Sequence, residues 1–219
     1  MTPPAPCLRF GPFELYEPVG RGASATVYRG LHIEQDIPVA VKVIKKRPQK
    51  ENVVSDPLGR EVRAVACLDH PGIVRVHDYG HLPTSLPVSA EGLDPEAPFL
   101  VMDLHSGGTL WPRLGQLGWP ELRSVLLRLL DALAHAHARG VIHRDLKPQN
   151  VLLGSQGPVL TDFGVAFALK REFSSRTAGS PNYMAPEQVQ SDWRAFGPWT
   201  DLYAVGCLGW ALTTGQAPF

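Results

Sequence analysis

A short glycine-bearing stretch, VGRGASATV at residues 19–27, has the residue types of a phosphate-binding loop. Gly20 and Gly22 follow the spacing G-x-G-x-x-G-x-V, but Ala25 stands at the third glycine position. By itself the stretch leaves three readings open: a working nucleotide loop, a degenerate one, or a glycine-bearing hairpin. The Ala25 methyl is tolerated if its φ is negative, whereas a positive φ would strain it by on the order of 1 kcal/mol. We expect a functional loop with modestly altered nucleotide affinity.

Four further motifs follow this loop in order: VAVK at 39–42, VIHRDLKPQNVLL at 141–153, LTDFGVA at 160–166 and GSPNYMAPE at 179–187. Each is weak evidence alone, because a lysine in a strand or an aspartate in a loop is usually a solvated surface residue. Together, in this order, they are specific. On these motifs the sequence resembles the protein kinase family, and YMAPEQ is most similar to its bacterial, eukaryotic-like serine/threonine branch.

The resemblance implies transfer of the ATP γ-phosphate to a protein hydroxyl, with ATP and Mg²⁺ as cofactors. Asp145 would orient the substrate hydroxyl and accept its proton, and Lys147 would place a positive charge near the transferring phosphate. Lys42 would bind the α- and β-phosphates. Glu61, on an expected helix, would pair with Lys42 and make that pair a potential activity switch.

The same resemblance implies a metal site and an adenine site. Asn150 and Asp162 would hold Mg²⁺, which prefers hard oxygen ligands. Adenine would lie between apolar side chains, although ordinary core packing is an alternative for these residues and both readings can hold at once. Met102 would be the gatekeeper, and the backbone of two hinge residues would hydrogen-bond the base. The implied ATP-binding residues are Gly20, Arg21, Gly22, Ala23, Ser24, Ala25, Val27, Ala40, Lys42, Met102, Asp103, His105 and Leu152.

Specificity and regulation are also implied by the resemblance. Lys147 and Ser180 favour serine/threonine substrates, with Ser180 helping to form the acceptor groove. Arg144 precedes Asp145, which in the family accompanies control by activation-loop phosphorylation. Thr177 is the favoured acceptor in that loop, and the alternative is that the loop hydroxyls are ordinary small polar residues.

The elements that must position these residues can be placed from periodicity and composition. A strand-rich first part precedes a helix-rich second part, which indicates an α+β fold. The resemblance makes this a bilobal protein kinase-like fold: an antiparallel N-lobe sheet with one helix, and a helical C-lobe truncated at its C-terminus. The expected domains are a flexible lead-in at 1–12, an N-lobe at 13–103 and an incomplete C-lobe at 104–219. Strands are expected at 13–20, 26–33, 37–44, 72–80 and 97–104, and helices at 58–70, 121–140 and 202–215.

Other expectations concern the second lobe. Asp201 matches a buried aspartate that braces the catalytic loop, and His143 should pack beneath Phe163. The histidines of HAH at 135–137 should point to different sides of a helix, which argues against a shared metal. Glu187 usually pairs with an arginine from a later helix, but the sequence stops at Phe219. We therefore expect a fragment of a longer protein with possible further domains, the alternative being a truncated form.

Composition excludes several classes of function. Twenty-one basic and 21 acidic residues give a net charge of +0, which argues against nucleic-acid binding. The 3 cysteines have no C-x-x-C spacing, and no apolar segment is long enough to span a membrane, so we expect a cytoplasmic protein. The favoured function is an ATP-dependent, non-specific serine/threonine protein kinase acting on protein substrates. The alternatives are a truncated or pseudokinase-like nucleotide-binding module and a small-molecule phosphotransferase.

Overall fold

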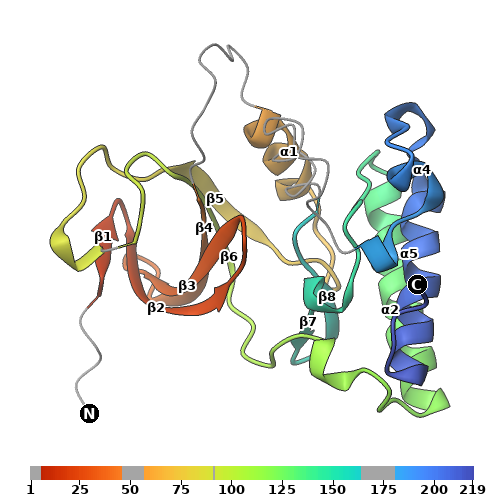
Figure 1. Cartoon of the computed structure of the whole chain (residues 1–219). Coiled ribbons are helices and arrows are strands. Elements are labelled where there is room, and N and C mark those ends of the chain that lie inside the picture. Colours follow the sequence, from red (N-terminus) through yellow and green to blue (C-terminus); the bar gives the residue numbers. More distant parts are fainter. Residues whose placement is uncertain (1–5, 46–56, 91, 164–180) are drawn as a thin grey trace. The chain divides into compact units, whose positions relative to one another are not determined.

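The computed structural model describes residues 6–45, 57–90, 92–163 and 181–219 (Figure 1). The chain divides into two compact units. Unit 1 comprises residues 1–52 and 75–104, and unit 2 comprises residues 53–74 and 105–219.

Unit 1 is built on a 6-stranded antiparallel sheet in the order β1-β2-β3-β4-β6-β5. Short connections join consecutive strands from β1 to β4, which the antiparallel arrangement of neighbouring strands allows. β6 breaks the sequential order by lying between β4 and β5. The strands expected at 13–20, 26–33, 37–44 and 97–104 are present in this unit. The strands are β1 (Leu8–Phe10), β2 (Phe13–Arg21), β3 (Ala25–His32), β4 (Ile37–Ile44), β5 (Val76–His81) and β6 (Pro98–Asp103).

β1 differs from the flexible lead-in expected over residues 1–12. Leu8 and Phe10 are 2% and 9% exposed, whereas Arg9 between them lies outside the core and its guanidinium is 3.6 Å from the Glu14 carboxylate. Alternation of this kind is typical of a strand with one buried face. The burial of the two apolar side chains stabilises the segment despite its proline-rich surroundings.

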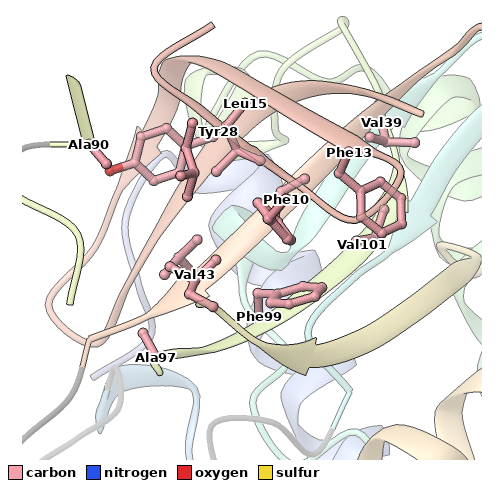
Figure 2. Packing of buried hydrophobic residues seen from close by; sticks show 13 residues of the cluster. Phe10, Phe13, Leu15, Tyr28, Val39, Val43, Ala90, Ala97, Phe99 and Val101 are labelled. Atoms are coloured by element: carbon pink, nitrogen blue, oxygen red, sulfur yellow. The ribbon is translucent and has the colours of Figure 1, made fainter. Parts of the chain in front are cut away.

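The side chains of β4 alternate between the two faces of the sheet. Val39, Val41 and Val43 point to one face and are buried in a hydrophobic cluster that Figure 2 shows. Aromatic rings close this cluster, and the centroids of Phe10 and Phe99 lie 4.8 Å apart in an edge-on arrangement. One face of the sheet is therefore core. The residues labelled in Figure 2 are Phe10, Phe13, Leu15, Tyr28, Val39, Val43, Ala90, Ala97, Phe99 and Val101.

The strand expected at 72–80 is divided between two pairings. Ile73 bridges Leu160 in parallel, and the Leu160 amide donates to the Gly72 carbonyl at 2.8 Å, within unit 2. Only Val76–His81 joins the sheet of unit 1 as β5. The apolar run is continuous in the sequence, so its periodicity could not show that two partners share it.

Unit 2 contains the helices and a two-stranded hairpin. The longest helix, α2, buries one stripe of side chains, of which Leu129 and Leu133 are at most 1% exposed. This confirms the amphipathic helix expected at 121–140. The elements with assigned bounds are α1 (Pro57–Ala66), η2 (Trp111–Arg113), α2 (Trp119–His137), η3 (Pro148–Asn150), β7 (Val151–Gly154), β8 (Gly157–Leu160), η4 (Pro181–Tyr183), α4 (Pro186–Val189), η5 (Trp193–Ala195) and α5 (Pro198–Thr214).

The end of α2 is closed by Gly140, which has φ +74°. The Val141 amide donates to the Ala136 carbonyl at 3.0 Å, and the Gly140 amide donates to the His137 carbonyl at 2.9 Å. This pair of bonds satisfies the last carbonyls of the helix and needs a residue that tolerates the left-handed region. The chain then turns directly into the motif that begins at Val141.

α5 is apolar on nearly every side. Asp201, Leu208 and Leu212 are at most 1% exposed, whereas Trp199 and Trp210 are more than half exposed. The expected buried helix at 202–215 thus exists and begins four residues earlier, at Pro198. In the described parts of the chain, no helix has both the length and the apolar character needed to cross a membrane.

Candidate active site

The second face of the unit 1 sheet carries the residues expected to contact a nucleotide. Val27 pairs with Lys42 across β3 and β4, and Ala40 pairs with Met102 across β4 and β6. Directly opposed residues share a face. The register therefore places these four side chains on one face, opposite the core cluster of Figure 2.

The glycine-bearing loop is a reversal between β2 and β3. Gly20 pairs with Val27, and the Gly22 amide donates to the Ala25 carbonyl at 2.8 Å. None of Gly20, Gly22 and Ala25 has a positive φ. Ala25 begins β3 and is 6% exposed. The alanine at the third glycine position is therefore compatible with the backbone, and the strain considered for a positive φ does not arise. Of the other loop residues expected to bind ATP, Arg21 pairs with Thr26, and Ala23 and Ser24 form the tip.

The expected Lys42–Glu61 pair stays a prediction. Lys42 lies in β4 of unit 1, opposite Leu100 of β6. Glu61 lies in α1, which belongs to unit 2, and its side chain is outside the described residues.

The two expected hinge residues, Asp103 and His105, belong to different units. Asp103 ends β6, where its amide donates to the Arg75 carbonyl at 3.1 Å and its carboxylate contacts Nε2 of His77 at 2.7 Å. His105 begins the second part of unit 2. The structure thus provides a sheet-anchored Asp103 backbone, while the binding of adenine by either residue remains a prediction.

The loop at residues 143–150 of unit 2, which is the proposed catalytic loop, brings three expected residues together. The Lys147 ammonium lies 2.7 Å from Oδ2 of Asp145. Asn150 Nδ2 donates to the same oxygen at 3.0 Å and to the Asp145 backbone carbonyl at 2.7 Å. The Asp145 side chain is 12% exposed, so one carboxylate is held by two donors and still reaches the surface. A fixed, accessible carboxylate of this kind is suited to orienting a hydroxyl.

The Asp201 side chain of α5 holds this loop through hydrogen bonds to its backbone, as expected. Its two carboxylate oxygens accept the backbone amides of His143 and Arg144, each at 2.8 Å. Nε2 of His137 contacts the same carboxylate at 2.7 Å. Asp201 is 1% exposed, so its charge is stabilised by these donors instead of water. Arg144 has φ +67°, a strained conformation that the brace helps to hold.

His143 is structural, as expected. It is fully buried, and its ring centroid lies 4.5 Å from that of Phe163. Nδ1 accepts the Asp145 amide at 3.3 Å, and Nε2 donates to the Thr161 carbonyl at 3.0 Å. An imidazole that accepts at one nitrogen and donates at the other is neutral. His143 therefore links the catalytic loop to the strand that leads to Asp162.

Asn150 and Asp162 come from neighbouring segments. The Thr161 amide donates to the Asn150 carbonyl at 3.0 Å, which joins the two segments just before Asp162. The Asn150 amide nitrogen is used by Asp145, so its oxygen is left to act as an acceptor. Across the described residues, no three His, Cys, Asp or Glu side chains form a metal-binding group. An amide oxygen and a carboxylate fit Mg²⁺ only as a partial ligand set, which phosphate oxygens would complete.

Leu152, the expected lower adenine contact, lies in β7 and forms a bridge with Thr109. The Leu153 amide donates to the Gly108 carbonyl at 2.9 Å, so the chain that follows the hinge is hydrogen-bonded to this hairpin. Leu152 is half-buried. Leu152 is thus held between Val159 of β8 and Thr109 by backbone pairing. Its contact with an adenine base stays a prediction.

Several contacts around the loop were not foreseen from the sequence. His137 was considered only as a metal ligand, yet it contacts Asp201, 64 residues away. Gln188 Nε2 donates to the Arg144 carbonyl at 2.7 Å, and Gln188 Oε1 accepts the Ala185 amide. No local pattern signals such long-range partners.

Glu187, for which the sequence predicts an arginine partner from a later helix, has a hydrogen-bond partner in α5. Glu187 is half-buried, and its carboxylate accepts a hydrogen bond from the Thr200 hydroxyl at 2.6 Å. Nearby, burial raises the pKa of the Tyr183 phenol, so this ring is neutral under ordinary conditions. The regulatory candidates Thr177 and Ser180 lie outside the described residues.

Comparisons with known proteins identify the family to which this chain belongs. A model of the protein kinase domain matches residues 13–219. Serine/threonine-protein kinase PknL of Mycobacterium tuberculosis is 38% identical over 208 residues, covering 92% of this chain and 49% of the relative. A probable serine/threonine-protein kinase PknB of Bifidobacterium longum is 33% identical, with 95% and 31% covered.

A plant relative, CBL-interacting serine/threonine-protein kinase 21 of Arabidopsis thaliana, is 34% identical, with 96% of this chain and 49% of the relative covered. The chain belongs to the protein kinase family, and the α+β protein kinase fold expected from the sequence is confirmed. The chain spans about half, or less, of the length of these relatives.

Proposed function

We propose that this chain is an ATP-dependent serine/threonine protein kinase domain. The observation that carries the proposal is the Asp145 carboxylate, held by Lys147 and Asn150 and braced through the backbone by Asp201. The names of the relatives, from bacteria and plants, support the serine/threonine assignment. That the phosphate acceptor is a serine or threonine hydroxyl of a protein substrate is also part of this proposal.

Asp145 would accept a hydrogen bond from the substrate hydroxyl and take its proton as the hydroxyl attacks the γ-phosphorus. Lys147, already 2.7 Å from Asp145, would stabilise negative charge on the transferred phosphoryl group. His143 and Asp201 keep the loop fixed, so little reorganisation is needed when the hydroxyl arrives.

ATP would be held by the residues expected for that role. Val27, Ala40 and Met102 would supply apolar contacts to the base, and Lys42 would bind the phosphates. Asn150 and Asp162 would hold Mg²⁺, which neutralises phosphate charge when bound.

Regulation by phosphorylation of Thr177, sensed through Arg144, belongs to the same proposal, as does a role for Ser180 in the acceptor groove. A reducing cytoplasm would suit the three free cysteines, Cys7, Cys67 and Cys207. Mass spectrometry after incubation with Mg-ATP tests whether Thr177 is phosphorylated. A Thr177→Ala protein with full activity would argue against it.

Transfer of radiolabelled phosphate from ATP to a generic serine- and threonine-containing protein tests the central claim. The wild-type protein should label the substrate only with Mg²⁺ present, and Asp145→Asn should reduce labelling by about 10²–10⁴-fold. Asp192→Asn, at an exposed position outside the site, is a matched control that should retain full labelling. Equal labelling by wild type and Asp145→Asn contradicts the proposal. Tight nucleotide binding without transfer would instead support the pseudokinase-like alternative.

A further inference from the structure

Lys45, the first residue after β4, contacts the glycine-bearing loop twice. Its backbone amide donates to the Ser24 carbonyl at 2.9 Å. Its side-chain ammonium donates to the Gly22 carbonyl at 2.7 Å. Gly22 lies just after β2 and Ser24 just before β3, so one residue ties both sides of the loop tip to the end of β4.

The Lys45 ammonium takes the place of the backbone hydrogen bond that usually closes a tight turn. In a four-residue turn the carbonyl of the first residue usually accepts the amide of the fourth, here from Gly22 to Ala25. Within the described residues the Gly22 carbonyl accepts Lys45 Nζ instead, while the Gly22 amide donates to the Ala25 carbonyl. Without the ammonium, this carbonyl can turn toward the Ala25 amide or toward water.

The direction of the Gly22 carbonyl decides the direction of the next amide. The C=O and N–H of a trans peptide point in opposite directions, so the Ala23 amide faces away from the Lys45 ammonium. In the described part of the chain, the amides of Ala23 and Ser24 have no hydrogen-bond partner. Successive unpaired amides at a turn form an anion-binding concavity.

We propose that Lys45 is a positioning residue for nucleotide phosphates. It holds the Gly22–Ala23 peptide so that the Ala23 amide is presented to a phosphate, and it acts through this backbone instead of binding the phosphate itself. Lys42 has the separate, direct role proposed above. The inference rests on the proposed ATP site, because it assigns a function to that loop.

Two measurements on the full chain test the inference, using Lys45→Met, Lys45→Arg and the control Arg9→Met. Arg9 is an exposed cation of β1, which pairs with the start of β2, whereas the loop follows the end of β2, so its replacement removes one positive charge away from the loop. Calorimetry compares the affinities for Mg-ATP and for adenosine, which lacks phosphates. NMR with ¹⁵N-labelled alanine follows the Ala23 amide in the nucleotide-free protein.

We expect Lys45→Met to weaken Mg-ATP binding about fivefold, with adenosine affinity unchanged, and to shift the Ala23 amide resonance. Lys45→Arg, which keeps a charged donor, should restore ATP affinity, and Arg9→Met should change neither measurement. Unchanged ATP affinity in Lys45→Met, an equal loss for ATP and adenosine, or an unshifted Ala23 resonance would each overturn the inference. If the wild-type protein binds neither ligand, the proposed function itself has failed.

Discussion

The carboxylate of Asp201 accepts the backbone amide of His143 at 2.8 Å, across 58 residues of sequence. This bond joins a helix that is buried along much of its length to the loop that carries Asp145, two residues further on. The position of the Asp145 carboxylate, the proposed catalytic group, therefore depends on a buried side chain of α5.

Replacing Asp201 by Asn should destabilise unit 2 by about 2 kcal/mol. The amide side chain retains one acceptor oxygen and presents an NH₂ group to a backbone donor, so at least one of the amides of His143 and Arg144 loses its partner. Urea denaturation followed by fluorescence measures the change. Asp192→Asn, which has no side-chain capping bond, should leave the free energy of unfolding unchanged. Equal stability of the two variants would show that the brace contributes nothing.

Replacing Lys147 by Met should lower kcat by about 100-fold and leave the KM for ATP within about threefold. The side chain keeps its apolar length but loses the charge that lies 2.7 Å from Asp145. Steady-state kinetics at varied ATP concentration separates the two constants. A rise in KM with unchanged kcat would place Lys147 in ground-state binding instead.

Replacing Ala25 by Gly should change ATP affinity by less than about threefold and lower stability by about 0.5–1 kcal/mol. Ala25 has no positive φ and its methyl is buried at the start of β3, so glycine relieves no strain and loses packing. Calorimetry and thermal unfolding give both numbers. A hundredfold gain in ATP affinity would mean that the methyl obstructs the phosphates.

The stability of the protein should fall as the pH drops below about 6.5, in part because of His135. Burial, then the charges of Arg139 and His70, lower the pKa of His135, although Asp69 and Asp131 act in the opposite direction. Its Nε2 is buried without a hydrogen-bond partner among the described residues. The unfolded chain therefore binds a proton at a pH where the folded chain does not, and stability is lost as the pH falls.

Urea titrations at pH 7.5 and pH 5.5 measure this difference. His135→Gln, which does not titrate, should show a smaller loss of stability between the two values than the wild type. An identical loss in both proteins would assign the pH dependence to other groups.

The elements that were predicted well have strong local signals. Leu129 and Leu133 mark one face of α2, and Gly140 marks its end, because helix periodicity and a left-handed cap can be read within a few residues. β1 and the division of residues 72–80 were not predicted. Their pairing partners, such as Leu160 for Ile73, lie far away in the sequence.

The sequence determined which residues are the candidates for the reaction: Asp145, Lys147, Asn150 and Asp162 stand in motifs that resemble those of the protein kinase family. The tertiary structure decided how they are held. Only folding brings His137 and Asp201 together beneath the loop, and only the conformation at Ala25 shows that its methyl group is unstrained. The physical reason is the range of the interactions: motif chemistry depends on residue type and order, whereas hydrogen bonds and burial depend on partners that the chain brings together only when it folds.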